Sequence, residues 1–284
     1  MAELLKGAPV AVALDKRTKS TAEALLREGV IPTLAILRVG ERDDDMAYER
    51  GAMKRCAKLG IAVKNVLLPS DVSQDVLISG IEKLNADQNA HGVLILRPLP
   101  KTLDEKAACA ALDPVKDVDG VTAASMAGIY SGSGDGFPPC TAQSCMELLK
   151  YYGVNPTGKR AVVIGRSLVI GKPVAMLLTS ADATVTVCHT KTADMPSVAR
   201  QADILIAAVG RAESIGPECF RTGQTVIDVG INWSEEKQKL VGDVNFDAAL
   251  SVVSAITPVP AGVGSVTTAV LAAQVVKAAE RTAL

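Results

Sequence analysis

The sequence predicts an α/β fold of two domains, each built on a parallel sheet with helices on its faces. Two observations lead to this prediction. Short apolar runs alternate with helix-like stretches in both halves of the chain, and a segment rich in glycine and proline separates the halves. The 284 residues are 48% apolar and 21% charged, which is the balance of a globular protein and excludes a disordered or fibrous chain.

The first half contains three strand candidates with helical stretches between them. The strands are expected at Thr33–Val39, Ile61–Leu68 and His91–Leu96, and the helices at about 44–59 and 72–86. Strands that alternate with helices in this way indicate right-handed crossovers and therefore a parallel sheet.

The segment Ser131–Pro139, SGSGDGFPP, is the clearest loop of the chain. A second alternating set follows it, and a helix rich in alanine and valine is expected at about 266–283. The strand candidates of this second set are Ala161–Ile164, Thr184–Val187, Ile204–Ala207 and Thr225–Asp228. We therefore expect two α/β domains that are joined near residues 137–141.

Charge and composition exclude several classes of function. The 30 basic and 31 acidic residues give a net charge of -1, so nothing indicates nucleic-acid binding. No apolar run approaches the ~18 residues of a membrane span, and the N-terminus is too short and too charged for a signal peptide. Six scattered cysteines without a CxxC pair indicate reduced thiols and no metal site. The sequence thus predicts a cytoplasmic protein.

A nucleotide site is expected where the strand Ala161–Ile164 leads into a helix. Gly165 and Gly171 flank this turn, and Arg166 and Ser167 lie between them. Glycine at a strand-to-helix turn lets the backbone approach a phosphate, and the helix N-terminus favours the anion. The spacing is not GxGxxG, so an ordinary glycine-containing turn remains open as an alternative.

The end of the next strand indicates which dinucleotide would bind. Folds that bind NAD usually place an acidic residue there to hold the ribose 2′-hydroxyl. Here the sequence is Cys188-His-Thr-Lys-Thr192, with hydroxyl and cationic donors and no acid. Together with Arg166 this favours a 2′-phosphate and hence NADP. His189 has a structural alternative, as a cap at the strand end.

Six collinear segments carry a family resemblance. They are Pro114–Gly120, Pro139–Thr141, Val162–Ser167 with Gly171–Pro173, Asp228–Asn232, Val241–Val244 and Thr257–Gly264. In this order they resemble the methylenetetrahydrofolate dehydrogenase/cyclohydrolase family (FolD type) over nearly the whole chain. The resemblance implies a cytoplasmic homodimer. It also implies a folate-binding catalytic domain at 1–140, to which the C-terminal helix 262–284 returns, and a Rossmann NADP-binding domain at 141–261.

The same resemblance assigns roles to individual residues. Tyr48 matches the family's tyrosine that stacks on the pterin, and Asp119 matches the aspartate that anchors the pterin by hydrogen bonds. Arg166 and Thr190 match the contacts to the 2′-phosphate. The remaining cofactor-binding residues that it implies are Gly165, Ser167, Gly171 and Ile231. Tyr48 has an alternative as an ordinary aromatic, and Asp119, like Asp117, as a cap of the turn before Gly120.

Two departures from the family pattern concern proton transfer. The family carries a lysine four residues after its tyrosine, where this chain has Ala52, although Cys56 and Gly60 keep the register. Lys54 matches a second family lysine, but at ~100° per residue it lies on another side of the helix. The family segment VQLPLP becomes Ile95-Leu-Arg-Pro-Leu-Pro100, so its glutamine is Leu96, and Arg97 is expected on the opposite face of the strand.

These observations lead to one functional hypothesis and three alternatives. We expect an NADP-dependent methylenetetrahydrofolate dehydrogenase that acts on tetrahydrofolate one-carbon derivatives, with the cyclohydrolase step weak or lost. Hydride transfer depends mainly on alignment, whereas hydrolysis needs a positioned acid or base. The alternatives are a fully bifunctional dehydrogenase/cyclohydrolase, a non-catalytic regulator that binds a dinucleotide, and a Rossmann dehydrogenase for a different small substrate, which Tyr48 and Asp119 disfavour.

Overall fold

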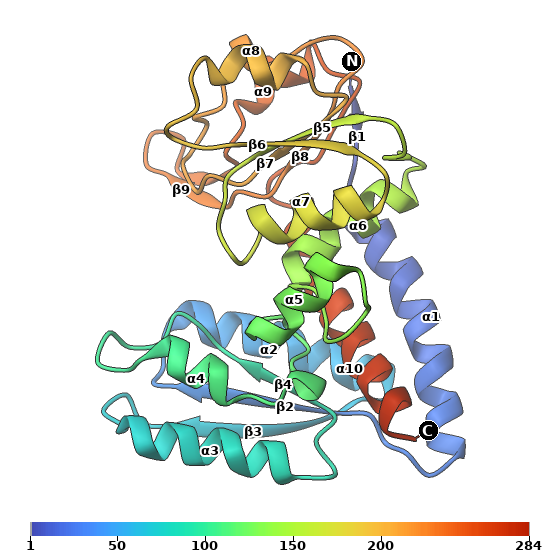
Figure 1. The fold of residues 1–284 in the computed structure, drawn as a ribbon, viewed down its shortest axis with the longest axis vertical. Coiled ribbons are helices and arrows are strands. Elements are labelled where there is room, and N and C mark those ends of the chain that lie inside the picture. Colours follow the sequence, from blue (N-terminus) through green and yellow to red (C-terminus); the bar gives the residue numbers. More distant parts are fainter. Residues whose placement is uncertain (1, 284) are drawn as a thin grey trace. The chain divides into compact units, whose positions relative to one another are not determined.

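A computed structural model describes residues 2–283, which divide into two compact units (Figure 1). The three-stranded unit comprises Ala13–Cys140 and the chain from Thr268 onward. The six-stranded unit comprises the residues up to Val12 and Thr141–Thr267. Both sheets are parallel and carry helices, which confirms the predicted α/β class. The functional division into 1–140 with 262–284 and 141–261 stays a prediction.

The three-stranded unit has the strand order β3-β2-β4. Its strands are β2 (Thr33–Val39), β3 (Ala62–Leu68) and β4 (Gly92–Ile95), close to the predicted ranges. Its helices are the larger part of α1 (Gly7–Arg27), α2 (Asp43–Leu59), α3 (Gln74–Ala86), α4 (Glu105–Ala111), α5 (Ala123–Ser131) and nearly all of α10 (Thr267–Ala283), with a 3-10 turn at Pro114–Lys116.

Both faces of this sheet are covered. On one face, Leu37 of β2 and Ile95 of β4 belong to a cluster with residues of α3 and α4. On the other face, a Cβ atom at Gly92 would overlap the Val118 side chain and come into tight contact with that of Val275, so α10 lies close to β4 there. The same face carries Arg38, whose partner lies on α2. Alternation along β2 and β4 therefore assigns their odd positions to α3 and α4, and their even positions to α2 and α10.

The six-stranded unit has the order β1-β11-β8-β7-β5-β6, and every pairing in it is parallel. Its strands are β1 (Glu3–Leu4), β5 (Arg160–Ile164), β6 (Thr184–Cys188), β7 (Ile204–Ala207), β8 (Thr225–Asp228) and β11 (Ala255–Ile256). Its helices are α6 (Cys140–Tyr151) apart from its first residue, α7 (Gly171–Ser180), α8 (Met195–Arg200) and α9 (Phe246–Leu250). Two 3-10 turns, Pro217–Cys219 and Val263–Ser265, and an antiparallel hairpin of β9 (Asn232–Ser234) with β10 (Lys239–Val241) complete it.

The strand order reverses direction at β5. The chain goes from β5 to β6 on one side and then continues with β7 and β8 on the other side. At such a switch point the loops that leave the carboxyl ends of the two central strands diverge, and ligands of open α/β sheets bind there. The loops after β5 and β7 are therefore the first place to look for a nucleotide site.

Three further properties bear on function. Within residues 2–283 no helix is long and apolar enough to cross a bilayer. In the same range no three His, Cys, Asp or Glu residues gather as a metal site would require. All six cysteines are free thiols.

Candidate functional site

Helix α2 carries Tyr48 and Ala52 one turn apart. Tyr48 is half-buried, whereas Ala52 is only 1% exposed on the face that packs toward the sheet. Lys54 is exposed, as the helical angle predicts. Arg55 binds Asp15 of α1, with 2.6 Å between Nη1 and Oδ1, and donates to Thr268 of α10. Lys54 and Arg55, the two cations that follow Ala52 most closely, therefore do not take the place of a lysine at position 52.

A buried ion pair lies one helical turn before Ala52. The Nε atom of Arg38, on β2, is 2.7 Å from Oε2 of Glu49, and both side chains are less than a tenth exposed. Arg38 also donates to the carbonyl of Gly40. Sequence reasoning missed this pair, although a charged residue within the apolar run of β2 was a signal for it. Because both charges are partnered, the pair is a fixed structural element beside Ala52.

Leu96 extends β4 by one residue. Its N–H donates to the carbonyl of Leu37 at 2.9 Å, and its side chain is 6% exposed. As an even position it points to the side of the sheet that α2 covers. The two positions where the family pattern has lysine and glutamine are thus both buried and apolar here. An apolar pair leaves no buried polar group without a partner, which makes the double replacement physically coherent.

The two aspartates of the segment Pro114–Gly120 have different surroundings. Asp117 is fully buried and accepts hydrogen bonds from the N–H groups of Val121 and Thr122 and from the Ser125 hydroxyl. The turn-capping role considered for both aspartates therefore belongs to Asp117. Asp119 remains 24% exposed.

Asp119 is held by few groups. Its Oδ1 accepts from the Cys140 N–H at 3.4 Å, and its Oδ2 lies 4.0 Å from Nη2 of Arg97. Burial raises the pKa of Asp119, while the Cys140 side chain and the Arg97 guanidinium act in the opposite direction. Arg97 was not among the predicted site residues. Among the ion pairs of the described chain, it is the cation that lies within 4.0 Å of the Asp119 carboxylate.

Helix α10 fixes the segment that carries Asp119. The amide nitrogen of Gln274 donates to the Val118 carbonyl at 2.7 Å and to the Pro138 carbonyl at 3.1 Å. Gln274 itself is buried. Helix α10 therefore holds the backbone next to Asp119, the candidate substrate-binding residue. No local sequence pattern indicated this support.

The nucleotide turn of the six-stranded unit requires both of its glycines. Gly165 has φ +130°, and a Cβ atom there would overlap the carbonyl of Ala208 after β7. A Cβ atom at Gly171 would overlap the Gly165 carbonyl. These close approaches need residues without side chains, so the turn is more constrained than an ordinary loop.

Ser167 and the first residues of α7 complete this turn. The Ser167 hydroxyl accepts from the N–H groups of Ile170 at 3.2 Å and Gly171 at 3.5 Å. Arg166 is exposed, and the Ile170 N-cap of the ten-residue helix α7 makes no side-chain capping bond. The N-terminus of α7 and the exposed guanidinium of Arg166 thus belong to one turn, an arrangement that favours binding of an anion.

The turn after β6 lies next to this loop, because the Gly165 N–H donates to the Cys188 carbonyl at 2.9 Å. His189 Nδ1 accepts from the Lys191 N–H at 3.1 Å, and the His189 N–H donates to the Thr192 hydroxyl. His189 therefore has the capping role that was considered for it. Thr190 and Lys191 are exposed, and the turn holds no acidic residue.

Two buried carboxylates organise the loops after β7 and β8. Asp243 accepts from the N–H groups of Val209, Gly210 and Arg211, and Asp228 accepts from those of Gly230, Asp243 and Val244. Burial raises the pKa of Asp228 to about 6 despite these hydrogen bonds.

The hydrogen bonds of Asp228 and Asp243 also fix the segment before the β9–β10 hairpin. A Cβ atom at Gly230 would overlap the Asp243 carboxylate, and the following Ile231 is 58% exposed. The predicted cofactor residue Ile231 therefore projects from a rigid loop at the carboxyl edge of the sheet.

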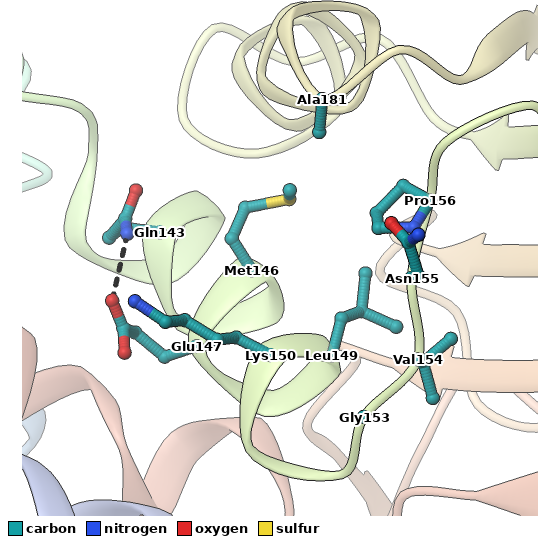
Figure 2. A pocket seen from close by; sticks show the side chains of 10 residues that line it. All are labelled: Gln143, Met146, Glu147, Leu149, Lys150, Gly153, Val154, Asn155, Pro156 and Ala181. Carbon is teal, nitrogen blue, oxygen red and sulfur yellow. Dashed lines mark hydrogen bonds between the residues drawn. The ribbon is translucent and has the colours of Figure 1, made fainter.

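A pocket of about 410 Å³ lies elsewhere in the six-stranded unit (Figure 2). Met146 and Leu149 of α6 point into it, and Val154, Pro156 and Ala181 line the other sides. Residues 153–156 lead into β5, and Ala181 precedes β6. The pocket therefore lies toward the amino ends of these strands, away from the turn that follows β5.

Comparisons with known proteins match the whole arrangement. The family model described as the catalytic domain of tetrahydrofolate dehydrogenase/cyclohydrolase matches residues 5–119, and that of its NAD(P)-binding domain matches residues 139–283. The chain is 48% identical to the bifunctional protein FolD of Clostridioides difficile, over 97% of this chain and 96% of that one.

Two solved structures show how closely the fold agrees. The bifunctional FolD enzyme from Campylobacter jejuni is 36% identical with a TM-score of 0.96, and 99% of each chain is covered. The FolD enzyme from Trypanosoma brucei, complexed with NADP cofactor and an inhibitor, is also 36% identical, with a TM-score of 0.91 over 99% of this chain and 98% of that one.

Proposed function

The chain belongs to the tetrahydrofolate dehydrogenase/cyclohydrolase family, and from that premise we propose that it is an NADP-dependent methylenetetrahydrofolate dehydrogenase with a weak or absent cyclohydrolase activity. The reaction oxidises 5,10-methylenetetrahydrofolate to the 5,10-methenyl form. The observation that carries the proposal is the buried apolar pair Ala52 and Leu96 beside a retained Tyr48 and Asp119.

On the substrate side, Tyr48 and Asp119 are the proposed catalytic-domain contacts. A half-buried tyrosine offers a ring face for stacking against a flat heterocycle. Asp117 already accepts hydrogen bonds from backbone N–H groups of the turn, so Asp119 is the accessible carboxylate of the segment. Asp119 can accept hydrogen bonds from N–H groups of the pterin. We assign this binding to residues 1–140 with the C-terminal helix 262–284.

On the cofactor side, residues 141–261 are the proposed nucleotide domain, and the residues present fit NADP. Gly165 and Gly171 allow the backbone of the turn to pack so closely that any Cβ atom would overlap a carbonyl, and Ser167 holds the turn. Arg166 and Thr190 would hold the 2′-phosphate, with Ile231 against the rest of the cofactor. When bound, NADP supplies the hydride acceptor. The NADP complex of the related FolD enzyme from Trypanosoma brucei supports this choice of cofactor.

The dehydrogenase step makes few demands on protein side chains. The nitrogen lone pairs of the substrate expel the hydride and stabilise the methenyl cation that is formed. What the chain must supply is orientation, and alignment of reacting carbons is worth far more than any single proton transfer here. Tyr48 and Asp119 orient the pterin without taking up or releasing a proton.

The cyclohydrolase step makes different demands. Water adds to the methenyl carbon, and protons must move as the ring opens to 10-formyltetrahydrofolate. A positioned acid or base contributes typically 10²–10⁴-fold to such a step. At positions 52 and 96 this chain offers a methyl and an isobutyl group, and the nearby Arg38 and Glu49 are already bound to each other.

A coupled assay tests the proposal. Purified protein is given methylenetetrahydrofolate and NADP, and the absorbance of NADPH and of methenyltetrahydrofolate is followed together. We expect NADPH and the methenyl product to accumulate in equal amounts. Hydrolysis that keeps pace with oxidation contradicts the loss of the second activity, and absence of NADPH contradicts the dehydrogenase.

A fully bifunctional enzyme is the second candidate. The name of the Clostridioides difficile relative, bifunctional protein FolD, favours it. The same assay separates the two candidates, because only a bifunctional enzyme removes the methenyl product. We further propose that the protein is a cytoplasmic homodimer; sedimentation of the purified chain tests the dimer, and fractionation of cells tests the location.

A further inference from the structure

Arg97 stands out among the groups that the proposed chemistry does not use. It lies two residues after the end of β4, and its side chain is 21% exposed. Within the described chain, its Nε atom is one of two buried side-chain nitrogen or oxygen atoms that lack a hydrogen-bond partner. A buried donor without an acceptor is unfavourable, so this guanidinium has binding capacity that the protein itself does not satisfy.

The guanidinium is anchored on one side only. Its Nη1 lies 3.4 Å from Oε1 of Glu105 on α4, and Oε2 of Glu105 accepts from the Leu99 N–H at 2.9 Å. Glu105 thus ties Arg97 to the segment that follows it. The other terminal nitrogen, Nη2, faces Asp119.

The distance between Arg97 and Asp119 is informative. At 4.0 Å, Nη2 and Oδ2 attract each other electrostatically but are too far apart to share a hydrogen bond. The Arg97 guanidinium, a donor, and the Asp119 carboxylate, an acceptor, therefore lie side by side, and each can make a further hydrogen bond to a ligand. Such a pair is complementary to a cyclic amide edge, where an N–H and a C=O group sit on adjacent ring atoms.

We propose that Arg97 and Asp119 together recognise the lactam edge of the pterin ring. The Asp119 carboxylate accepts from the ring N–H, and the Arg97 guanidinium donates to the neighbouring carbonyl oxygen. This inference rests on the proposed function, because it takes the pterin as the ligand of Asp119. It adds a specificity-determining residue, at a position where the family segment VQLPLP has leucine.

Electrostatics supports this division of roles. Burial raises the pKa of Asp119, and the nearby guanidinium lowers it, so Arg97 favours the ionised form that only accepts. A guanidinium has donors and no acceptor, so it only donates. The donor role of Arg97 is therefore fixed, and Arg97 discriminates against a ligand with a donor in place of the carbonyl.

The test compares two ligands that differ along this lactam edge. The affinities of tetrahydrofolate and of its 4-amino-4-deoxy analogue, which carries an amine in place of the carbonyl and has no hydrogen on the adjacent ring nitrogen, are measured by calorimetry. We expect wild type to prefer the 4-oxo ligand by at least about tenfold. In Arg97→Leu, tetrahydrofolate binding should weaken by about 10–100-fold with little change for the analogue, so that the preference narrows to the part that Asp119 supplies.

Two further variants complete the experiment. Arg97→Lys keeps a cationic donor and should retain part of the preference. Arg50→Leu, which removes an exposed arginine from α2, should bind both ligands as wild type does. An unchanged preference in a folded Arg97→Leu overturns the inference alone, provided that wild type turns over methylenetetrahydrofolate. Wild type that binds neither ligand overturns the proposed function as well.

Discussion

Returning the missing side chains to positions 52 and 96 should create cyclohydrolase activity. In Ala52→Lys/Leu96→Gln, the ammonium enters a site that is 1% exposed, beside the buried Arg38–Glu49 pair. Burial and the cation of Arg38 both favour the neutral amine, which brings the lysine toward the pKa range of a useful acid and base. The amide of the new glutamine supplies a partner for the lysine.

The expected magnitudes follow from these surroundings. Cyclohydrolase activity should rise by about 10²–10⁴-fold in the double variant, because that is what a positioned acid or base contributes. The new buried charge should lower the free energy of unfolding by about 3–5 kcal/mol in Ala52→Lys alone. The double variant should lose less, since its lysine has a partner. The two changes should therefore be non-additive for both quantities.

The assay starts from methenyltetrahydrofolate and follows the decay of its absorbance, with dehydrogenase activity as the measure of an intact fold. Ala57→Lys is the matched control, because it adds a lysine to an exposed position of the same helix. It should leave both activities unchanged. If the folded double variant hydrolyses the methenyl compound no faster than wild type and this control, the side chains at 52 and 96 do not limit the step.

Three more outcomes are expected. The carboxyl of Asp228 has its pKa raised from 3.8 to about 6, so the folded state holds this proton more tightly than the unfolded state. Its contribution to stability is therefore greatest below pH 4 and is lost as the pH rises through 6. By urea titration, wild type should lose about 2 kcal/mol more than Asp228→Asn between pH 4 and pH 7. Gly171→Ala should weaken NADP binding by tenfold or more in a fluorescence titration, because its Cβ atom would overlap the Gly165 carbonyl, whereas Gly51→Ala, with open space around it, should bind normally. Arg166→Leu should lower the ratio of kcat/KM for NADP over NAD by about 10–100-fold, and an unchanged ratio means that another group binds the 2′-phosphate.

Strands with strong local patterns were predictable from the sequence. The runs at 33–39 and 204–207 match β2 and β7 at both ends, because continuous apolar residues identify buried parallel strands. The two-residue strands β1 and β11 were not predicted. They pair with each other from opposite ends of the chain, and nothing in two residues signals such a partner.

Helix α1 was missed although its sequence contains a signal. Val10, Leu14 and Leu25 are buried along one side of the helix, and Pro9 stands in its first turn, where proline is tolerated. The apolar positions are separated by polar residues, so no single run is conspicuous.

Residues of the candidate site were predictable where a motif surrounds them, as for Asp119 and Gly165. The partners of those residues were not. Arg97 and Asp119, which lie close to each other, are separated by 22 positions of sequence. Arg38 forms an ion pair with Glu49 on the next helix. Ion pairs of this kind depend on how strands and helices pack, and the spacing along the chain does not encode them.

The fate of the methenyl product in a single turnover tests the division between hydride transfer and proton transfer most directly. Wild-type protein in excess over methylenetetrahydrofolate is mixed with NADP, and the 10-formyl product is quantified as NADPH appears. We expect methenyltetrahydrofolate to form in step with NADPH and then to decay only at the rate seen without protein. Formation of 10-formyltetrahydrofolate as fast as NADPH would show that this pocket moves protons without the lysine and glutamine, and would contradict the central claim.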